Sequence, residues 1–369
     1  MKEKELHKNL YMLEGSYTKK GYDWWWHSFT AISEKTGEEK AFYVEYFFIN
    51  PLLSPSKVMH GVDGLPSYMM LNCGSWGKEN KSQLHRFYSY NQVTIAKNHL
   101  EISGDEFLLT ENHIKGHVNV KNPTQGMLCD EGEMLFDIKL DKKITYDVGY
   151  GTSPIFRKLK AFDMYWHAQG VKTLMSGEVI YNGEKYIVKP ETCYGYSDKN
   201  WGKDFTSPWV WLSSWDLVSE LSGKRLSNSV FEIGGGRPRA FGITFNRKLL
   251  IAMFYEGKKY EFNFSKFWTF TKTKFDCYET DEKIIWDITT KSFKNRLIVH
   301  IECSKEEMLL INYEAPNGEK KFHRLFNGGT GSGYLELYHG NKLIDKMKTS
   351  HVGCEYGTYH SEGDNYYKK

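Results

Sequence analysis

The chain has 369 residues, of which 40% are hydrophobic, 26% charged and 16% aromatic. This length is enough for two ordinary domains or one large β domain, and the high aromatic content favours sheet. The formal net charge of +3 is too small to indicate a nucleic-acid partner, and we expect none.

The sequence carries no sign of secretion or of a membrane span. Its first ten residues, MKEKELHKNL, are charged and lack the apolar region of a signal peptide. No apolar run approaches the length of a membrane helix, so we expect no integral membrane segment. The six cysteines are scattered without a CxxC pair, which favours reduced thiols. We therefore expect a cytoplasmic protein.

Two aromatic segments near the amino terminus predict a β-hairpin. Residues 23–29 carry three consecutive tryptophans, which in a strand point to both faces, and residues 40–49 form the second strand. Glu45 shares a face with Tyr43 and Phe47, whereas the opposite face is wholly apolar. An inward Glu45 would be a buried acid with a raised pKa. We favour an outward, exposed Glu45, because the apolar face is better suited to the core.

Short strand patterns continue along the chain. They recur about every ten residues up to residue 140, and Asn182-Gly183 between two strand patterns is a strong hairpin signal. The second half repeats this style, and helical patterns are confined to short pieces near residues 154–159 and 305–310. The chain is therefore predicted to form two consecutive antiparallel β units, each large enough to close a barrel. Strands are expected over residues 240–245, 249–254, 260–264, 283–288, 296–301 and 333–338.

Common catalytic and cofactor motifs are missing. The glycine runs 234–236 and 327–333 do not lead into a helix and are interpreted as turns, and the tail from Thr349 shows no clear core role. No GxSxG, HExxH, Walker or dinucleotide fingerprint occurs. His113 and His117 would share a strand face, but no third ligand has a supportive spacing, so no metal site is predicted.

The most informative stretch is residues 194–217, YGYSDKNWGKDFTSPWVWLSSWDL. Gly195 and Gly202 bracket its polar cluster, so we predict a sharp turn there, followed by a strand over residues 208–217. Alternation in that strand places Trp209, Trp211 and Trp215 in one row. Indoles beside a carboxylate, an ammonium and an amide suit a pocket for an apolar ligand with a polar end. The alternative is a β-turn with local hydrogen bonds next to a core strand.

Three motifs together resemble the tocopherol cyclase family. They are Asn182-Gly183-Glu184-Lys185-Tyr186, Gly195-Tyr196-Ser197-Asp198-Lys199-Asn200-Trp201-Gly202, and Phe205 followed by Trp209 and Trp211. The hallmark of that family is an acid-Lys-Asn/Asp-Trp-Gly motif, a Phe-Pro-type turn and a Trp-x-Trp strand. The first hairpin, which closes on Asn50-Pro51, is also similar to the family's. Thr206-Ser207-Pro208 departs from the pattern, because the family tends to place Pro directly after Phe.

The resemblance implies an architecture and a substrate class. Related carotenoid hydratases and intramolecular Diels–Alderases consist of two lipocalin-like β-barrels. We accordingly predict an all-β fold with few short helices, an N-terminal barrel over residues 1–190 and a C-terminal barrel over residues 191–369. The ligand pocket is expected at or near the barrel interface. The implied substrate is a hydrophobic isoprenoid- or polyene-type molecule, and the implied cyclase or isomerase uses no cofactor.

Proton-initiated cyclisation needs an acid, aromatic faces that stabilise a cation, and a dry pocket. Asp198 is the first candidate acid and Glu45 the second, each held protonated by desolvation. Lys199 would lower the pKa of Asp198, unless the two neighbours point to opposite faces of a strand. The candidates for substrate binding are Trp25, His27, Tyr43, Tyr196, Lys199, Asn200, Trp201, Trp209 and Trp211.

Two other functions fit the same residues. A lipocalin-like carrier or sensor would bind a hydrophobic molecule without turnover, and the Asp198-Lys199-Asn200 cluster would only fix a turn. A pericyclase would close a ring by holding its substrate in a reactive shape. Asp198→Asn separates the three, since only a proton-initiated cyclase loses turnover while it keeps its ligand affinity.

Overall fold

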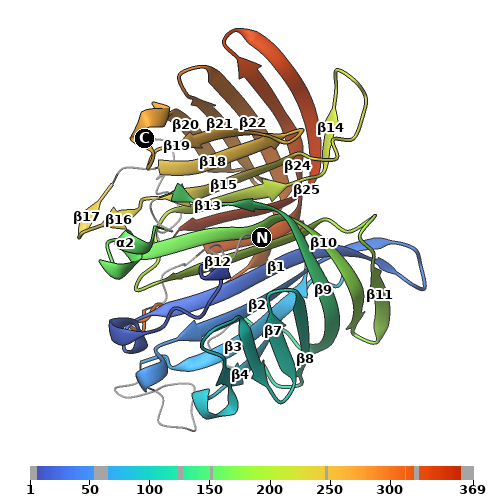
Figure 1. The fold of residues 1–369 in the computed structure, drawn as a ribbon. Coiled ribbons are helices and arrows are strands. Elements are labelled where there is room, and N and C mark those ends of the chain that lie inside the picture. Colours follow the sequence, from blue (N-terminus) through green and yellow to red (C-terminus); the bar gives the residue numbers. More distant parts are fainter. Residues whose placement is uncertain are drawn as a thin grey trace.

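The computed structural model describes residues 6–53, 65–123, 128–149, 153–245, 248–311, 313–319 and 324–358. Figure 1 shows two large antiparallel sheets, each curled like a barrel and stacked against the other. Helical structure in the described residues is short, as in α2 (Pro154–Lys158) and the 3-10 turns η6 (Phe267–Thr269) and η7 (Lys305–Glu307). The predicted all-β fold of two barrels is confirmed. No helix among the described residues is long and apolar enough to cross a membrane.

The first sheet runs in the order β4-β3-β2-β1-β11-β10-β9-β8-β7-β6-β5, and β12 pairs with both β1 and β10. Its strands are β1 (Tyr22–Ser33), β2 (Glu39–Ile49), β3 (Tyr68–Ser75), β4 (Ser82–Tyr88), β5 (Thr94–Ile95), β6 (Glu101–Gly104), β7 (Phe107–Thr110), β8 (His113–Val120), β9 (Gly132–Tyr146), β10 (Met164–Tyr181), β11 (Glu184–Val188) and β12 (Gly195–Gly202). Both predicted hairpins, β1–β2 and β10–β11, are present. The sheet extends through Gly202, past the predicted boundary at residue 190.

The second sheet runs in the order β19-β18-β15-β13-β25-β24-β22-β21-β20, with β14 and β23 attached at its side. Its strands are β13 (Trp209–Ser214), β14 (Leu217–Ser219), β15 (Val230–Gly236), β18 (Lys248–Tyr255), β19 (Lys258–Asn263), β20 (Lys272–Glu279), β21 (Lys283–Lys291), β22 (Asn295–Ser304), β23 (Leu309–Leu310), β24 (Arg324–His339) and β25 (Lys342–Thr358). The predicted strand 240–245 is instead a small separate hairpin of β16 (Arg239–Ala240) and β17 (Ile243–Thr244), because Phe241 and Gly242 turn with positive φ.

The described residues form three apolar clusters. One fills the first barrel and one fills the second, so both barrel interiors are occupied by side chains. The third cluster lies between the barrels and takes Trp26 and Tyr43 from the first sheet and Trp211 and Leu325 from the second. Strands β1 and β2 are therefore buried on both faces, one by their own barrel and one by the neighbouring barrel.

Glycines inside strands make room for indoles where the barrels meet. The two glycine runs were predicted to be turns, but they lie within β15 and β24. The tail from Thr349 was predicted to lack a core role, but as far as Thr358 it belongs to β25, which pairs with β13. A Cβ on Gly234 would lie 2.7 Å from the Trp166 ring, and one on Gly353 would lie 2.3 Å from the Trp211 ring. These glycines are needed for close approach of a ring rather than for a turn.

Candidate active site

The predicted site residues on strand β12 point to two different sides of the strand. Residues 195–202 are a continuous buried strand paired with β1, so the predicted turn, and the alternative of a β-turn with local hydrogen bonds, are both wrong. Alternation along β12 sends Asp198 toward the second barrel and its neighbour Lys199 into the first. The ammonium that would have lowered the pKa of Asp198 therefore points away from it.

Four predicted substrate-binding residues lie inside the first barrel. Lys199 forms an ion pair with Asp23, and its Nζ lies 3.5 Å from the centre of the Trp25 ring and 5.4 Å from that of Trp201. His27 is buried on the same face of β1 as Trp25, with Nδ1 2.9 Å from the Ser197 hydroxyl. These side chains belong to a packed core and do not line the cavity at Asp198.

The other predicted residues come together between the barrels. A cavity of about 30 Å³ lies there, with room for one or two water molecules. It is lined by Trp24, Trp26, Met164, Asp198, Asn200, Phe205, Trp209, Trp211, Tyr313, Leu325 and Glu355. Tyr196 and Tyr43 lie in the same cluster of buried side chains. Trp215, predicted in the indole row, lies beyond the end of β13 and packs on Tyr194.

Among the residues that the structure describes, only one oxygen of Asp198 has hydrogen-bond partners. Its Oδ2 accepts hydrogen bonds from Trp166 Nε1 at 2.9 Å and from the Tyr196 hydroxyl at 3.1 Å. Its Oδ1 is buried and has no hydrogen-bond partner among the described residues. Burial raises the pKa of Asp198 to about 7 and the nearby Glu355 adds to the rise, although the Trp166 and Tyr196 hydrogen bonds oppose it. A large fraction of this carboxyl is therefore neutral near pH 7.

Tyr196 connects Asp198 to a second carboxyl, Glu232 on β15. The Tyr196 hydroxyl lies 2.9 Å from Glu232 Oε1, and Trp211 Nε1 donates to the same Oε1 at 3.0 Å. Burial raises the pKa of Glu232 well above its usual range. Because a hydroxyl has one proton to donate, it satisfies both carboxyls only if one of them is protonated and donates to it. The geometry thus fits a state in which one of the two carboxyls, Glu232 or Asp198, is protonated and the Tyr196 hydroxyl links them by hydrogen bonds.

Two further buried acids face this region. Glu355 on β25 accepts hydrogen bonds from Trp209 Nε1 at 2.7 Å and Asn327 Nδ2 at 2.5 Å, and burial raises its pKa to about 7. Glu45 accepts from Asn72 Nδ2 at 3.0 Å, and burial raises its pKa to about 8. The predicted exposed position of Glu45 is wrong, because the second barrel covers the outer face of β2.

Sequence reasoning missed Trp166, Asn72, Tyr313, Glu232 and Glu355. A shared signal marks the two missed acids together with Glu45, since each is the single carboxylate of an apolar or glycine-rich five-residue segment: YVEYF, VFEIG and GCEYG. No local pattern marks Trp166, whose role depends on contact with β12 across the sheet. Among the described residues no group of three or more His, Cys, Asp or Glu is placed to hold a metal ion.

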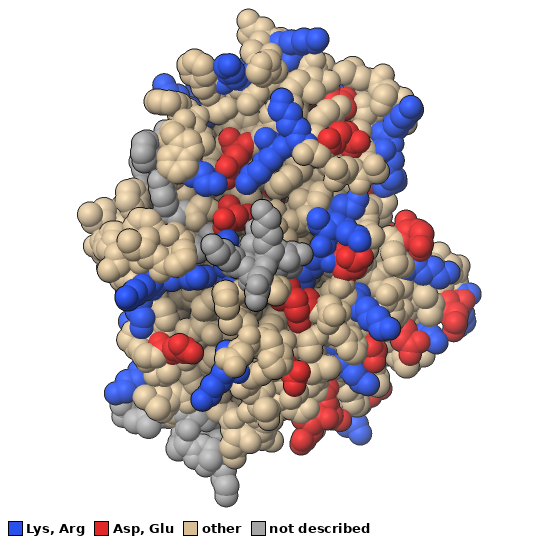
Figure 2. Space-filling view, in the orientation of Figure 1, with Lys and Arg blue, Asp and Glu red and all other residues tan. Residues whose placement is uncertain are grey.

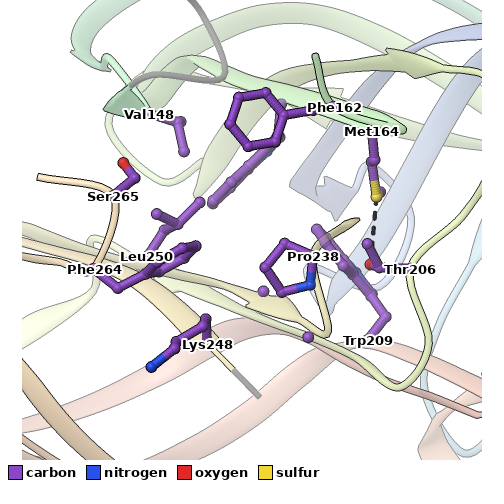
Figure 3. A pocket seen from close by; sticks show the side chains of 13 residues that line it. Val148, Phe162, Met164, Thr206, Trp209, Pro238, Lys248, Leu250, Phe264 and Ser265 are labelled. Atoms are coloured by element: carbon purple, nitrogen blue, oxygen red, sulfur yellow. Dashed lines mark hydrogen bonds between the residues drawn. The ribbon is translucent and has the colours of Figure 1, made fainter. Parts of the chain in front are cut away.

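An apolar pocket of about 80 Å³ adjoins the acid cavity (Figure 3). Phe162, Pro238, Leu250 and Phe264 surround it, and its walls come from both barrels. Met164 and Trp209 line the pocket and the acid cavity alike. Met164 and Trp209 therefore lie between the apolar pocket and the cavity at the buried carboxyls.

The raised pKa values of the buried carboxyls predict that these groups lower stability as pH rises from about 4 to about 8, whereas the lowered pKa values of the buried His27, His85 and His167 act in the opposite direction below about pH 6.5. Glu45, Asp198 and Glu355 keep their protons in the folded chain up to pH 7–8, whereas carboxyls of the unfolded chain lose theirs near pH 4. The folded state then binds more protons, and each group lowers the free energy of unfolding by up to about 1.4 kcal/mol per pH unit. Denaturant unfolding across this pH range measures the slope. Glu45→Gln should reduce it, and an unchanged slope in that variant contradicts the assignment.

Fold and site together define a class: an all-β protein of two barrels whose interface holds buried carboxyls, indoles and an apolar pocket. A family model described as "Tocopherol cyclase-like" matches residues 72–358, which is most of the chain and includes Asp198. The chain belongs to the tocopherol cyclase-like family, as the sequence resemblance implied.

Two plant proteins match a shorter part of the chain. The probable tocopherol cyclase, chloroplastic, of Oryza sativa subsp. japonica is 33% identical over 101 residues, which are 27% of this chain and 20% of that protein. The tocopherol cyclase, chloroplastic, of Zea mays is 31% identical over 101 residues, with the same shares. The chain thus covers about a fifth of the length of these relatives. Kievitone hydratase from Nectria haematococca shares the fold, with a TM-score of 0.50 and 12% identity over 95% of this chain and 92% of that one.

Proposed function

We propose that the protein is a cofactor-independent cyclase or isomerase that protonates a carbon–carbon double bond of a hydrophobic isoprenoid- or polyene-type substrate. One observation carries this proposal: Asp198, a carboxyl with a raised pKa, has an oxygen without a hydrogen-bond partner in the described part of the chain, at a cavity of indoles that adjoins an apolar pocket. A binding protein has no need for a buried acid that is partly neutral at pH 7, because burying such a group costs stability.

The chemistry follows from the two oxygens of Asp198. Trp166 and Tyr196 fix Oδ2, so a proton on Oδ1 is the one available for transfer to an alkene carbon. A C–H bond forms, and the other alkene carbon becomes a cation. A hydroxyl of the same substrate then attacks that carbon and releases its own proton to the Asp198 carboxylate. Atoms balance without a cofactor, and substrate and product have the same mass.

The surroundings stabilise the cation. Trp24, Trp26, Trp209 and Trp211 line the cavity, and each ring face that meets a cation contributes about 0.5–2 kcal/mol. The cavity has little room for water, which limits quenching of the cation. Water that does reach the cation would instead add to it and give a hydration product. Hydration is the reaction in the name of the structural relative kievitone hydratase.

Glu232 has a place in keeping Asp198 protonated before the substrate binds, since the substrate hydroxyl itself returns the proton within each turnover. The Tyr196 hydroxyl lies within hydrogen-bond distance of both Asp198 Oδ2 and Glu232 Oε1, so it offers a path for a proton between the two carboxyls. Burial favours the protonated form of Glu232, which makes this residue a proton reserve. Glu232 acts through Tyr196 and is a positioning residue rather than a catalytic one.

Incubation with prenylated hydroquinones and other polyenes, without cofactor, tests the proposal by chromatography and mass spectrometry. We expect a new product of unchanged mass, formed more slowly as pH rises above about 7, because Asp198 loses its proton there. A mass gain of one water would assign a hydratase. Substrates that stabilise the protein on heating but stay unconverted would assign a carrier and reject the cyclase.

A further inference from the structure

Exposed apolar side chains gather around the mouth of the apolar pocket. They are between 42% and 71% exposed, far more than large apolar residues in a protein core. We call them the apolar rim: Ile155, Leu159, Phe241, Ile243, Phe245, Trp268 and Phe270. Such clustering marks an interaction surface, whereas single exposed apolar residues are ordinary.

Backbone contacts join the rim segments. Phe241 N donates to Ala161 O at 2.8 Å and Asp163 N donates to Arg239 O at 3.1 Å, which fixes the β16–β17 hairpin beside the segment that follows α2. Phe162 and Pro238 from these two segments line the pocket together with Phe264, which precedes η6. Figure 1 shows α2, β16 and β17 projecting at the left side of the molecule. The rim therefore surrounds the pocket rather than being spread over the protein.

The same segments are strongly basic. Residues 153–162, 237–248 and 264–275 contain three, four and three Lys or Arg residues respectively, and the nearest acids, Asp163, Glu261 and Asp276, flank these segments. This is a local concentration of charge, since the whole chain has a net charge of only +3. In Figure 2 the projection at the left edge is tan, with blue Lys and Arg side chains directly below it.

We propose that the apolar rim docks on the surface of an anionic lipid bilayer, with the pocket mouth facing the lipid. Apolar side chains on a basic background insert at the headgroup boundary, where anionic headgroups attract Lys and Arg. A protein partner would bury a flat, largely neutral patch more readily than these segments, which keep an excess of Lys and Arg although Arg239 pairs with Asp163 and Lys266 pairs with Glu261. Docking does not depend on the proposed activity. If that activity holds, docking gives an apolar substrate a path from the bilayer to Asp198.

Co-sedimentation of the full chain with lipid vesicles tests the docking. We expect binding to vesicles of phosphatidylcholine mixed with phosphatidylglycerol, weaker binding to phosphatidylcholine alone, and weakening by salt. The double variant Phe241→Ser/Ile243→Ser should lose at least about tenfold in affinity, because two apolar side chains no longer insert. Lys158→Glu changes two units of charge and should lose roughly 25-fold.

Matched controls lie elsewhere on the surface. Leu221 is 62% exposed and Lys224 is also exposed, and both lie near β14 on the opposite side of Figure 1. Leu221→Ser and Lys224→Glu should bind vesicles as the unaltered protein does. Thermal unfolding checks that each variant folds. If Phe241→Ser/Ile243→Ser fails to fold, Lys158→Glu still tests the same face.

Three outcomes would overturn the proposal. The first is no binding to anionic vesicles at low salt, and the second is an equal loss in the β14 controls. The third is a change of oligomeric state in the rim variants by light scattering, which would assign the face to self-association. Because this assay contains no substrate, its failure leaves the proposed activity untouched.

Discussion

Asp198→Asn is expected to lower turnover by about 10²–10⁴-fold while ligand affinity stays within a few-fold, since positioned acids contribute about that much. Asparagine keeps the shape of the side chain and can still accept the Trp166 hydrogen bond, but it has no acidic proton for the Oδ1 position. The change removes a step made only in the transition state, so kcat and kcat/KM should fall together. Turnover and ligand-induced thermal stabilisation, measured on one preparation, separate the two effects.

Two further substitutions make this result specific. Glu232→Gln keeps the acid but removes the carboxyl that shares a proton with Asp198 through Tyr196, so we expect a smaller fall in kcat/KM, greatest at high pH, where Asp198 of the free protein is most often ionised. Asp345→Asn is the control, because Asp345 is a buried carboxyl of the second barrel that accepts from Ser219 and Tyr255 away from the cavity. Full activity in Asp198→Asn would reject the acid and favour ring closure by proximity alone.

Lys199→Met is expected to cost about 3–5 kcal/mol of folding stability, because it leaves Asp23 buried without a counter-charge. That is a large share of the roughly 5–15 kcal/mol that stabilises an ordinary domain. Burial raises the pKa of Asp23 even beside Lys199, so protonation of Asp23 at low pH should recover part of the loss. Urea unfolding at pH 7 and pH 5 measures both effects.

The double variant Asp23→Asn/Lys199→Met tests the cause. It removes both charges together and should be more stable than Lys199→Met alone, because no uncompensated ion remains. The alternative is that Lys199 contacts the ligand, as its place in the motif predicted. Unaltered stability in Lys199→Met, combined with lost ligand binding, would establish that alternative.

The sequence by itself determined most of the β-strands, the two hairpins and the alternation of side chains, although it predicted a turn where β12 lies. The Asn182-Gly183 turn shows why: its signal is local, and Asn and Gly are the residue types that adopt positive φ most readily. The family resemblance and the choice of Asp198 as a candidate acid also came from local motifs. The sequence also predicted that Asp198 and Lys199 would point to opposite faces if they lay in a strand. The structure shows this arrangement, because side-chain alternation depends only on strand geometry.

Tertiary structure alone decided which strand faces meet. An outward face of β2 looks exposed when a single barrel is considered, yet the second barrel covers it and buries Glu45. Glu355 is separated from Asp198 by more than a hundred and fifty residues of sequence, and Trp166 reaches Asp198 across paired strands. The glycines of β15 and β24 look like turn residues until an indole from elsewhere in the chain lies against Gly234 and Gly329. Local sequence determines a strand and its two faces, whereas contacts between distant segments determine the dielectric environment, and hence the pKa, of a buried acid.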